Sequence, residues 1–254
     1  MPLDITVISL FPEMFTALNY SITGRAQQQQ LIKLTFLNPR DFTDDPHKTV
    51  DDRPYGGGPG MVMKYQPMKA AIDAAKRRVG TDTPVVHLSP QGNPLNQKAL
   101  FNLSQQNTLI LLASRYEGVD ERLLQEAVDI EYSVGDYVVS GGELPAMILI
   151  DGLTRLIPGA LGHKDSATTD SFSHGLLDHP HYTRPEVIAG HSVPKILLSG
   201  DHASIERWRL KEALGRTWQK RPDLLKRRTL NSKEQPLLDE YQKEHSEPDG
   251  EEKQ

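Results

Sequence analysis

Three short glycine-containing segments of this chain could hold a small molecule with backbone groups. They are residues 89–92 (SPQG), 114–118 (SRYEG) and 135–142 (GDYVVSGG), and the first two directly follow apolar runs. Open α/β sheets bind ligands at the carboxyl ends of their strands, and glycine lets a backbone approach a ligand closely. Each segment alone is more typical of a turn, and none is the GxGxxG signature of a dinucleotide site. Together they indicate a pocket at one edge of a sheet.

The densest glycine cluster, residues 55–61 (YGGGPGM), is weaker evidence for a site. It lacks the Gly-Lys-Ser/Thr end of a phosphate-binding P-loop, and it neither follows a strand nor opens a helix cleanly. A tight surface loop explains it equally well.

Asp170 lies in a polar segment, residues 166–173, whose composition is typical of a flexible loop. An acid in such a loop is usually only solvated, but a loop that closes can deliver it as a general base. Arg155 lies near the end of the preceding helical pattern. His179-Pro180-His181 suggests a metal, yet two histidines without spaced carboxylates are poor evidence. These residue types alone leave the chemistry open.

The pattern of apolar residues predicts strands that alternate with helices. We expect strands at residues 5–11, 31–37, 85–88, 108–113 and 132–139, and helices at 12–29, 66–79, 95–105, 120–128, 143–156 and from 204 onward. Strands that are apolar throughout are typical of a parallel sheet covered on both faces. The sequence therefore predicts an α/β fold that brings the three glycine segments to one sheet edge.

Composition excludes several classes of protein. The chain has 254 residues, of which 37% are hydrophobic, enough for one large domain or a domain with a smaller companion. It contains no cysteine, which excludes a disulfide framework, cysteine-ligated zinc, iron–sulfur clusters and a thiol nucleophile. No apolar run is long enough to span a membrane and no basic leader opens the chain, so we expect a cytoplasmic protein.

Charge is distributed unevenly along the chain. Residues 207–228 hold nine Lys/Arg and two acids, whereas residues 229–254 hold three Lys and eight acids, in a protein of net charge −5. The basic stretch is a footprint for phosphates, although a solvated helix face explains a charge run as well. The last ten residues are acidic and of low complexity, which is typical of disorder.

Several longer strings together resemble one known family. They are ISLFPEMF (8–15), NPRDF (38–42), HKTVDDRPYGGGPGM (47–61), LSPQG (88–92), RYEGVDER (115–122), GDYV and GGELPA (135–146), DSF (170–172), PHYTRPE (180–186) and RWR (207–209). Through them the chain resembles, from about residue 1 to about 230, the bacterial tRNA (guanine-N1)-methyltransferases, the TrmD family of the SPOUT class.

The resemblance implies a fold and an activity. Residues 1–160 would form a knotted α/β domain that binds S-adenosylmethionine, with a parallel sheet and a deep trefoil knot, which is rare among folds. Residues 161–177 would be a flexible linker and active-site loop, residues 178–244 a small helical, basic tRNA-binding domain, and residues 245–254 a disordered acidic tail. The family acts as a homodimer with its active site at the subunit interface. It methylates N1 of guanosine 37 of tRNA, next to the anticodon, and binds neither DNA nor membranes.

The resemblance also implies roles for particular residues. Asp170 matches the proposed general base, and Arg155 matches the residue proposed to stabilise negative charge on the guanine O6. The positions implied for S-adenosylmethionine are Leu88, Ser89, Pro90, Gln91, Gly92, Ser114, Arg115, Tyr116, Glu117, Gly118, Val134, Gly135, Asp136, Tyr137, Val138, Val139, Gly141 and Gly142. The positions implied for tRNA are Asp51, Gly60, Arg209, Arg216 and Lys220. Some members are thought to use magnesium, and nothing in this sequence shows where it would bind.

The chain departs from the family pattern in two places. His87 and Ser114 stand where many relatives have Tyr and Gly, so we expect altered cofactor affinity rather than lost activity. The acidic segment after about Leu238 is outside the shared pattern, and either solubilises the protein or competes with RNA for the basic helices. Two other functions stay open: a SPOUT methyltransferase with another RNA target, and a non-catalytic RNA-binding module.

Overall fold

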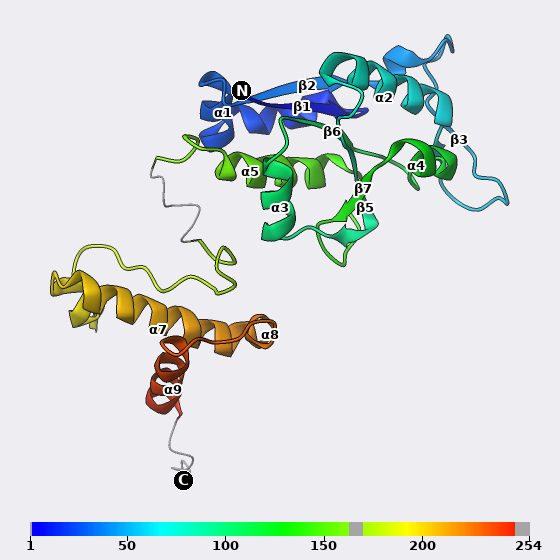
Figure 1. The fold of residues 1–254 in the computed structure, drawn as a ribbon. Coiled ribbons are helices and arrows are strands. Elements are labelled where there is room, and N and C mark those ends of the chain that lie inside the picture. Colours follow the sequence, from blue (N-terminus) through cyan, green and yellow to red (C-terminus); the bar gives the residue numbers. More distant parts are fainter. Residues whose placement is uncertain (1, 163–169, 247–254) are drawn as a thin grey trace. The chain divides into compact units, whose positions relative to one another are not determined.

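The computed structural model describes residues 2–162 and 170–246, and it divides into two compact units, Met1–Lys164 and Asp165–Gln254 (Figure 1). The predicted linker over 161–177 includes residues 163–169, and the predicted tail includes residues 247–254. Both of these stretches lie outside the described residues. In the described part of the chain, no helix combines the length and apolar character needed to cross a membrane.

The first unit is built on a parallel sheet, which confirms the expected fold class. Its strands lie in the order β2-β1-β6-β5-β7 and all pair in parallel. They are β1 (Leu3–Ile8), β2 (Ile32–Leu37), β5 (Val85–Pro94), β6 (Thr108–Leu112) and β7 (Ile130–Ser133). The helical segments are η1 (Pro12–Asn19), α1 (Ser21–Gln28), η2 (Pro39–Phe42), α2 (Tyr65–Val79), α3 (Gln97–Ser104), α4 (Glu121–Ala127) and α5 (Glu143–Leu156), and a short hairpin pairs β3 (Asp51–Asp52) with β4 (Val62–Met63).

Both faces of the sheet are buried, as the continuous apolar strands predict. In β6, Leu109 and Leu111 belong to one hydrophobic core, whereas Ile110 and Leu112 belong to the other. Helix α5 contacts both α1 and α3 over the first core, and α2 contacts α4 over the second. Strand β6 therefore places alternate side chains in two cores, which fixes its register in the sheet.

The predicted helix over residues 12–29 is wrong, because the structure contains two helices there. Between η1 and α1 the chain turns sharply, and Ser21 has a φ of 55°. A Cβ added to Gly24 would lie 2.2 Å from the backbone oxygen of Asn19. Only glycine permits so close an approach, and the turn it allows separates the two helices.

Strand boundaries also differ from the prediction. The predicted strand over 132–139 is wrong beyond Ser133, where the Ser133 side chain hydrogen-bonds Gly135 and the backbone of Gly135 takes a φ of 153°. Strand β1 begins and ends earlier than the predicted 5–11, and β5 continues past residue 88 with a register shift between Leu88 and Asn93. The apolar pattern located the strands but not their ends, because local turns end them.

The second unit is mainly helical. It contains β8 (Val187–Ile188), β9 (His191–Ser192), η3 (Lys195–Leu198), α7 (His202–Lys220), α8 (Pro222–Lys226) and α9 (Glu234–His245). Its core joins Leu176 and Leu214 to Leu237 and Leu238 of α9. A Cβ on Gly215 would lie 2.3 Å from the Tyr241 ring, so this glycine lets α9 pack directly on α7.

Candidate active site

A cavity of about 350 Å³ lies at the carboxyl ends of β5, β6 and β7. The three glycine segments predicted to meet there all contribute to its wall. The residues that line it are His87, Leu88, Ser89, Pro90, Gln91, Ser114, Tyr116, Glu117, Gly118, Val119, Glu121, Leu124, Glu131, Tyr132, Ser133, Val134, Gly135, Tyr137, Val138, Val139, Gly141, Gly142 and Pro145. The volume falls in the range of ligand pockets, which is about 300–1,000 Å³.

Of the residues predicted for the cofactor, all but Gly92, Arg115 and Asp136 line this cavity. Gly92 instead lies against strand β7, where a Cβ would be 2.5 Å from the backbone nitrogen of Tyr132. His87 of β5, expected at the pocket as a departure from the family pattern, also lines the cavity. Glu131 was not predicted for the pocket, because it lies within strand β7 rather than in a glycine segment.

The segment after β7 returns to the end of β6, where Gly142 makes close backbone contact. The Gly142 amide donates to the Ser114 carbonyl oxygen over 2.7 Å. A Cβ on Gly142 would lie 2.7 Å from the Ala113 Cα, closer than real Cβ atoms come. Glycine at this position therefore allows the third loop to close the cavity beside the second.

A chain of three polar side chains, centred on the buried His87, joins the three walls of the cavity. The His87 ring nitrogen Nδ1 lies 2.7 Å from Glu131 Oε1, and Nε2 lies 2.9 Å from Ser114 Oγ. His87 is only 3% exposed, and burial lowers its pKa although Glu131 acts in the opposite direction. His87 is therefore neutral at pH 7, with one ring nitrogen donating and the other accepting. His87 and Ser114, the two residues expected to depart from the family pattern, contact each other directly.

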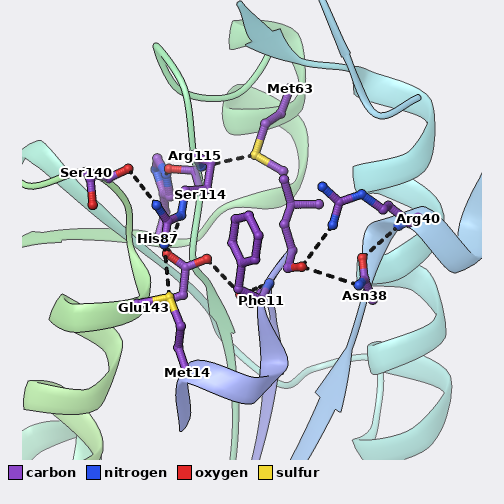
Figure 2. A network of polar contacts seen from close by, with 12 residues as sticks. Phe11, Met14, Asn38, Arg40, Met63, His87, Ser114, Arg115, Ser140 and Glu143 are labelled. Atoms are coloured by element: carbon purple, nitrogen blue, oxygen red, sulfur yellow. Dashed lines mark hydrogen bonds and ion pairs between the residues drawn. The ribbon is translucent and has the colours of Figure 1, made fainter. Parts of the chain in front are cut away.

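A second buried contact fixes the start of α5 (Figure 2). The Glu143 side chain is fully buried at the first turn of α5 and accepts a 2.8 Å hydrogen bond from Ser9 Oγ. Arg115 Nε lies 2.8 Å from Glu143 Oε2 without hydrogen-bond alignment, so this contact is an ion pair. The same guanidinium donates to the Ser140 carbonyl oxygen and lies over the Phe11 ring, 4.7 Å from its centroid.

These contacts explain why Arg115 does not line the cavity. Its side chain instead pairs with Glu143 in the first turn of α5. The helix dipole also stabilises a carboxylate at this end of a helix. Arg115 is thus placed as a support for the third loop, and the family resemblance alone did not distinguish this position from a lining one.

The loop that contains Asp51 and Gly60 ends against the second glycine segment. The Glu117 amide donates to the Met61 carbonyl oxygen over 2.9 Å, and a Cβ on Gly60 would lie 2.4 Å from Glu117 Oε1. Gly60 therefore adjoins a lining residue. Asp51 is in β3, where it pairs with Met63 of β4, and it is not among the residues that line the cavity.

The two residues predicted for catalysis belong to different units. Arg155 is in the last turn of α5 and is half-buried. Asp170 is also half-buried, and its backbone oxygen accepts from the Ser173 amide over 3.2 Å. The structure therefore assigns Arg155 to the sheet unit and Asp170 to the helical unit.

The basic stretch lies on α7 and α8, and much of it is already paired. Arg207 contacts Glu240, Arg209 lies 2.6 Å from Glu206, and Lys211 lies 2.6 Å from Glu244. Burial opposes the charged form of Lys211, but its hydrogen bonds to Glu244 and Glu240 raise its pKa. Within the described residues, the basic side chains of 207–228 that take part in no ion pair are Arg216, Lys220, Lys226 and Arg227.

Known proteins match nearly the whole chain. The family model described as tRNA (Guanine-1)-methyltransferase TrmD matches residues 3–227. A protein of Coxiella burnetii (strain RSA 493 / Nine Mile phase I) is 61% identical over 246 residues, which is 97% of this chain and 100% of the relative. Proteins of Pseudomonas putida (strain W619) and Idiomarina loihiensis are 58% and 57% identical over 95% and 94% of this chain, and over 97% and 96% of their own lengths.

Each of these relatives carries the name tRNA (guanine-N(1)-)-methyltransferase. The match to the family model and the identity over the full length of the relatives confirm the resemblance found in the sequence. The chain belongs to the tRNA (guanine-1)-methyltransferase TrmD family.

Proposed function

We propose that this chain transfers a methyl group from S-adenosylmethionine to N1 of guanosine in tRNA, at position 37 next to the anticodon. The observation that carries the proposal is a cavity that the loops after β5, β6 and β7 line together in a chain of this family. Ligands of open parallel sheets bind at this edge.

The lining residues suit S-adenosylmethionine. Backbone groups of residues 88–91 and 134–142 would hold the adenosine part, and the close backbone contact at Gly142 holds the third loop against the second. Glu117, Glu121 and Glu131 add negative charge to the wall, which suits a sulfonium cation. When bound, S-adenosylmethionine supplies an already electrophilic methyl group.

The residues of the chain must then handle the proton on guanine N1. A neutral guanine carries a proton at N1, so a base has to accept it as the methyl group arrives. We assign that role to Asp170, and to Arg155 the stabilisation of negative charge that develops on O6. The support is the family motif around Asp170 and the position of Arg155 in the last turn of α5.

Recognition of the tRNA is assigned mainly to the second unit. Arg209, Arg216 and Lys220 lie on α7 and would contact phosphates, which positions an RNA without reading its sequence. The target base has to leave its stack to enter a pocket, as base-modifying enzymes require. Asp51 and Gly60 are assigned to the neighbouring base, because the loop between them ends beside Glu117.

The finer architecture belongs to the same proposal. We infer a deep trefoil knot, because the chain after β7 passes the end of β5 and binds the end of β6 through Gly142. We also infer a homodimer with shared active sites and a separate tRNA-binding domain over residues 178–244. Magnesium is left without an assigned residue.

A methylation assay with purified chain tests this proposal. Transcribed tRNA with guanosine at position 37 should accept the methyl group of labelled S-adenosylmethionine, and the same tRNA with adenosine there should not. Digestion to nucleosides should yield N1-methylguanosine. Equal methylation of both tRNAs, or methylation of a ribose hydroxyl, would favour another SPOUT activity. A saturable tRNA complex without any S-adenosylmethionine binding would indicate a non-catalytic module.

A further inference from the structure

A cluster of two imidazoles and one carboxylate lies in the second unit, outside the residues assigned to methyl transfer. It consists of Asp178, His179 and His181. Asp178 Oδ1 lies 2.8 Å from His179 Nδ1, and Asp178 Oδ2 lies 2.8 Å from His181 Nε2. One ligand-type atom from each residue lies within 4.8 Å of the others. The sequence pattern His-Pro-His alone did not reveal this convergence, which depends on the neighbouring Asp178.

The backbone that carries the cluster is fixed by the core of the second unit. The Leu177 amide donates to Thr217 Oγ1 of α7 over 2.9 Å, and the Asp178 amide donates to Ser171 Oγ over 2.9 Å. Leu176 next to them is buried in the core with Leu214. The three ligand atoms therefore converge on an anchored segment rather than on a free terminus.

His179 and Asp178 favour the unprotonated form that binds a metal ion. Burial lowers the pKa of His179, so its imidazole is neutral. Burial alone would raise the pKa of Asp178, but hydrogen bonds from His181 and from the His179 amide outweigh it, and the net pKa is lowered. The positive charge of Arg209 on α7, which lies 2.6 Å from Glu206, also lowers the pKa of His179.

The donor set selects the class of ion. Two imidazole nitrogens and one carboxylate oxygen suit zinc and the neighbouring first-row transition ions, whereas magnesium and calcium prefer oxygen ligands. The His181 side chain is 70% exposed, so water can reach the remaining coordination positions. Three protein ligands with open positions are common in zinc sites.

We propose that Asp178, His179 and His181 bind a divalent transition ion of the zinc class. For the ion to bind, the proton that each imidazole donates to Asp178 moves to the other nitrogen of the same ring. Three metal–ligand bonds then replace the two imidazole–carboxylate hydrogen bonds, with only small movements of the side chains. The ion would link the side chains of residues 178 and 181. Because the Asp178 amide donates to Ser171 Oγ, the ion would also stabilise the turn at Ser171, next to Asp170.

Titration of the metal-free full-length chain with Zn²⁺, in competition with a chromophoric chelator, tests the proposal. Wild type should bind one equivalent that excess Mg²⁺ does not displace, and Co²⁺ should give the visible absorption bands of a nitrogen-ligated ion. His181→Ala should weaken Zn²⁺ binding by more than about tenfold, since even outer-shell partners of a metal are worth that much. Because His181 is largely exposed, this variant should keep the fold, which circular dichroism checks.

His202→Ala is the matched control, because His202 is exposed at the start of α7 and is not a member of the Asp178, His179 and His181 cluster. It should bind Zn²⁺ as wild type does. Asp178→Asn should weaken binding as His181→Ala does. The proposal is overturned if wild type shows no saturable equivalent, if His181→Ala binds as tightly as wild type, or if His202→Ala loses binding equally.

Discussion

The cavity of the first unit and the basic face of the second are built in opposite ways. The cavity depends on short-range contacts, in which Gly142 lies against the backbone of Ala113 and His87 joins strand β7 to the loop after β6 through Glu131 and Ser114. The basic face depends on exposed charges, several of them neutralised by acids of α9. Ligand binding by the cavity should therefore depend mainly on shape, and tRNA binding by the basic face should depend mainly on long-range charge.

The largest expected effect is chemical. Asp170→Ala should lower turnover by about 10²-fold or more, since a general base contributes that much, while S-adenosylmethionine binding by the cavity persists. Asp239→Ala, an exposed acid on α9, is the control and should keep normal turnover. Single-turnover methylation with saturating tRNA measures the difference. Near-normal turnover of Asp170→Ala would remove this residue from the role of base.

Gly142→Ala should produce the next largest effect, because the added methyl group meets the Ala113 backbone. Overpacking of this kind costs roughly 1–3 kcal/mol, so thermal unfolding should occur at a lower temperature and methylation should decline. Gly162→Ala is the matched control, since a Cβ there has no neighbour within 4 Å. Equal stability of the two variants would contradict the proposed close packing of the third loop.

The buried histidine should make the cavity region sensitive to pH. Because burial lowers the pKa of His87 below its value in the unfolded chain, its contribution to stability is complete above about pH 6.5 and is lost as the pH falls below that. The unfolding temperature of wild type should therefore fall further between pH 7.5 and pH 5 than that of His87→Gln, by roughly a few degrees. Parallel pH profiles of the two proteins would show that His87 does not titrate in this way.

The smallest effects should come from single charges of the basic face. Lys220 takes part in no ion pair within the described residues, so Lys220→Gln should lower the slope of log tRNA affinity against log salt by about 1. Arg207 is paired with Glu240, and Arg207→Gln should change that slope less. Binding measured at several salt concentrations distinguishes the two variants, and the reverse order would mean that the α9 acids leave α7 available to RNA.

The sequence predicted the sheet edge because its signals are local. Residues 108–112 form a continuous apolar run, and glycine segments follow it and its neighbours, so both the strand and its loop could be recognised. The polar contacts of the cavity could not be predicted in this way. His87 and Glu131 are 44 positions apart and meet only when β5 pairs with β7. The same holds for Glu143, whose partners Ser9 and Arg115 come from two other strand ends.

Helix α9 was the less predictable part of the second unit. Its acids were expected either to solubilise the chain or to compete with RNA, whereas Glu240 and Glu244 contact Arg207 and Lys211 of α7. Charge counts along a sequence do not reveal which charges neutralise one another after two helices pack.

Calorimetric titration of the wild-type chain with S-adenosylmethionine, beside Gly142→Ala and Gly162→Ala, tests the central claim most directly. If the three loops form the binding site, wild type and Gly162→Ala will bind saturably with equal affinity, and Gly142→Ala will bind more weakly. Absence of saturable binding by wild type, or unchanged affinity of Gly142→Ala, would contradict the account.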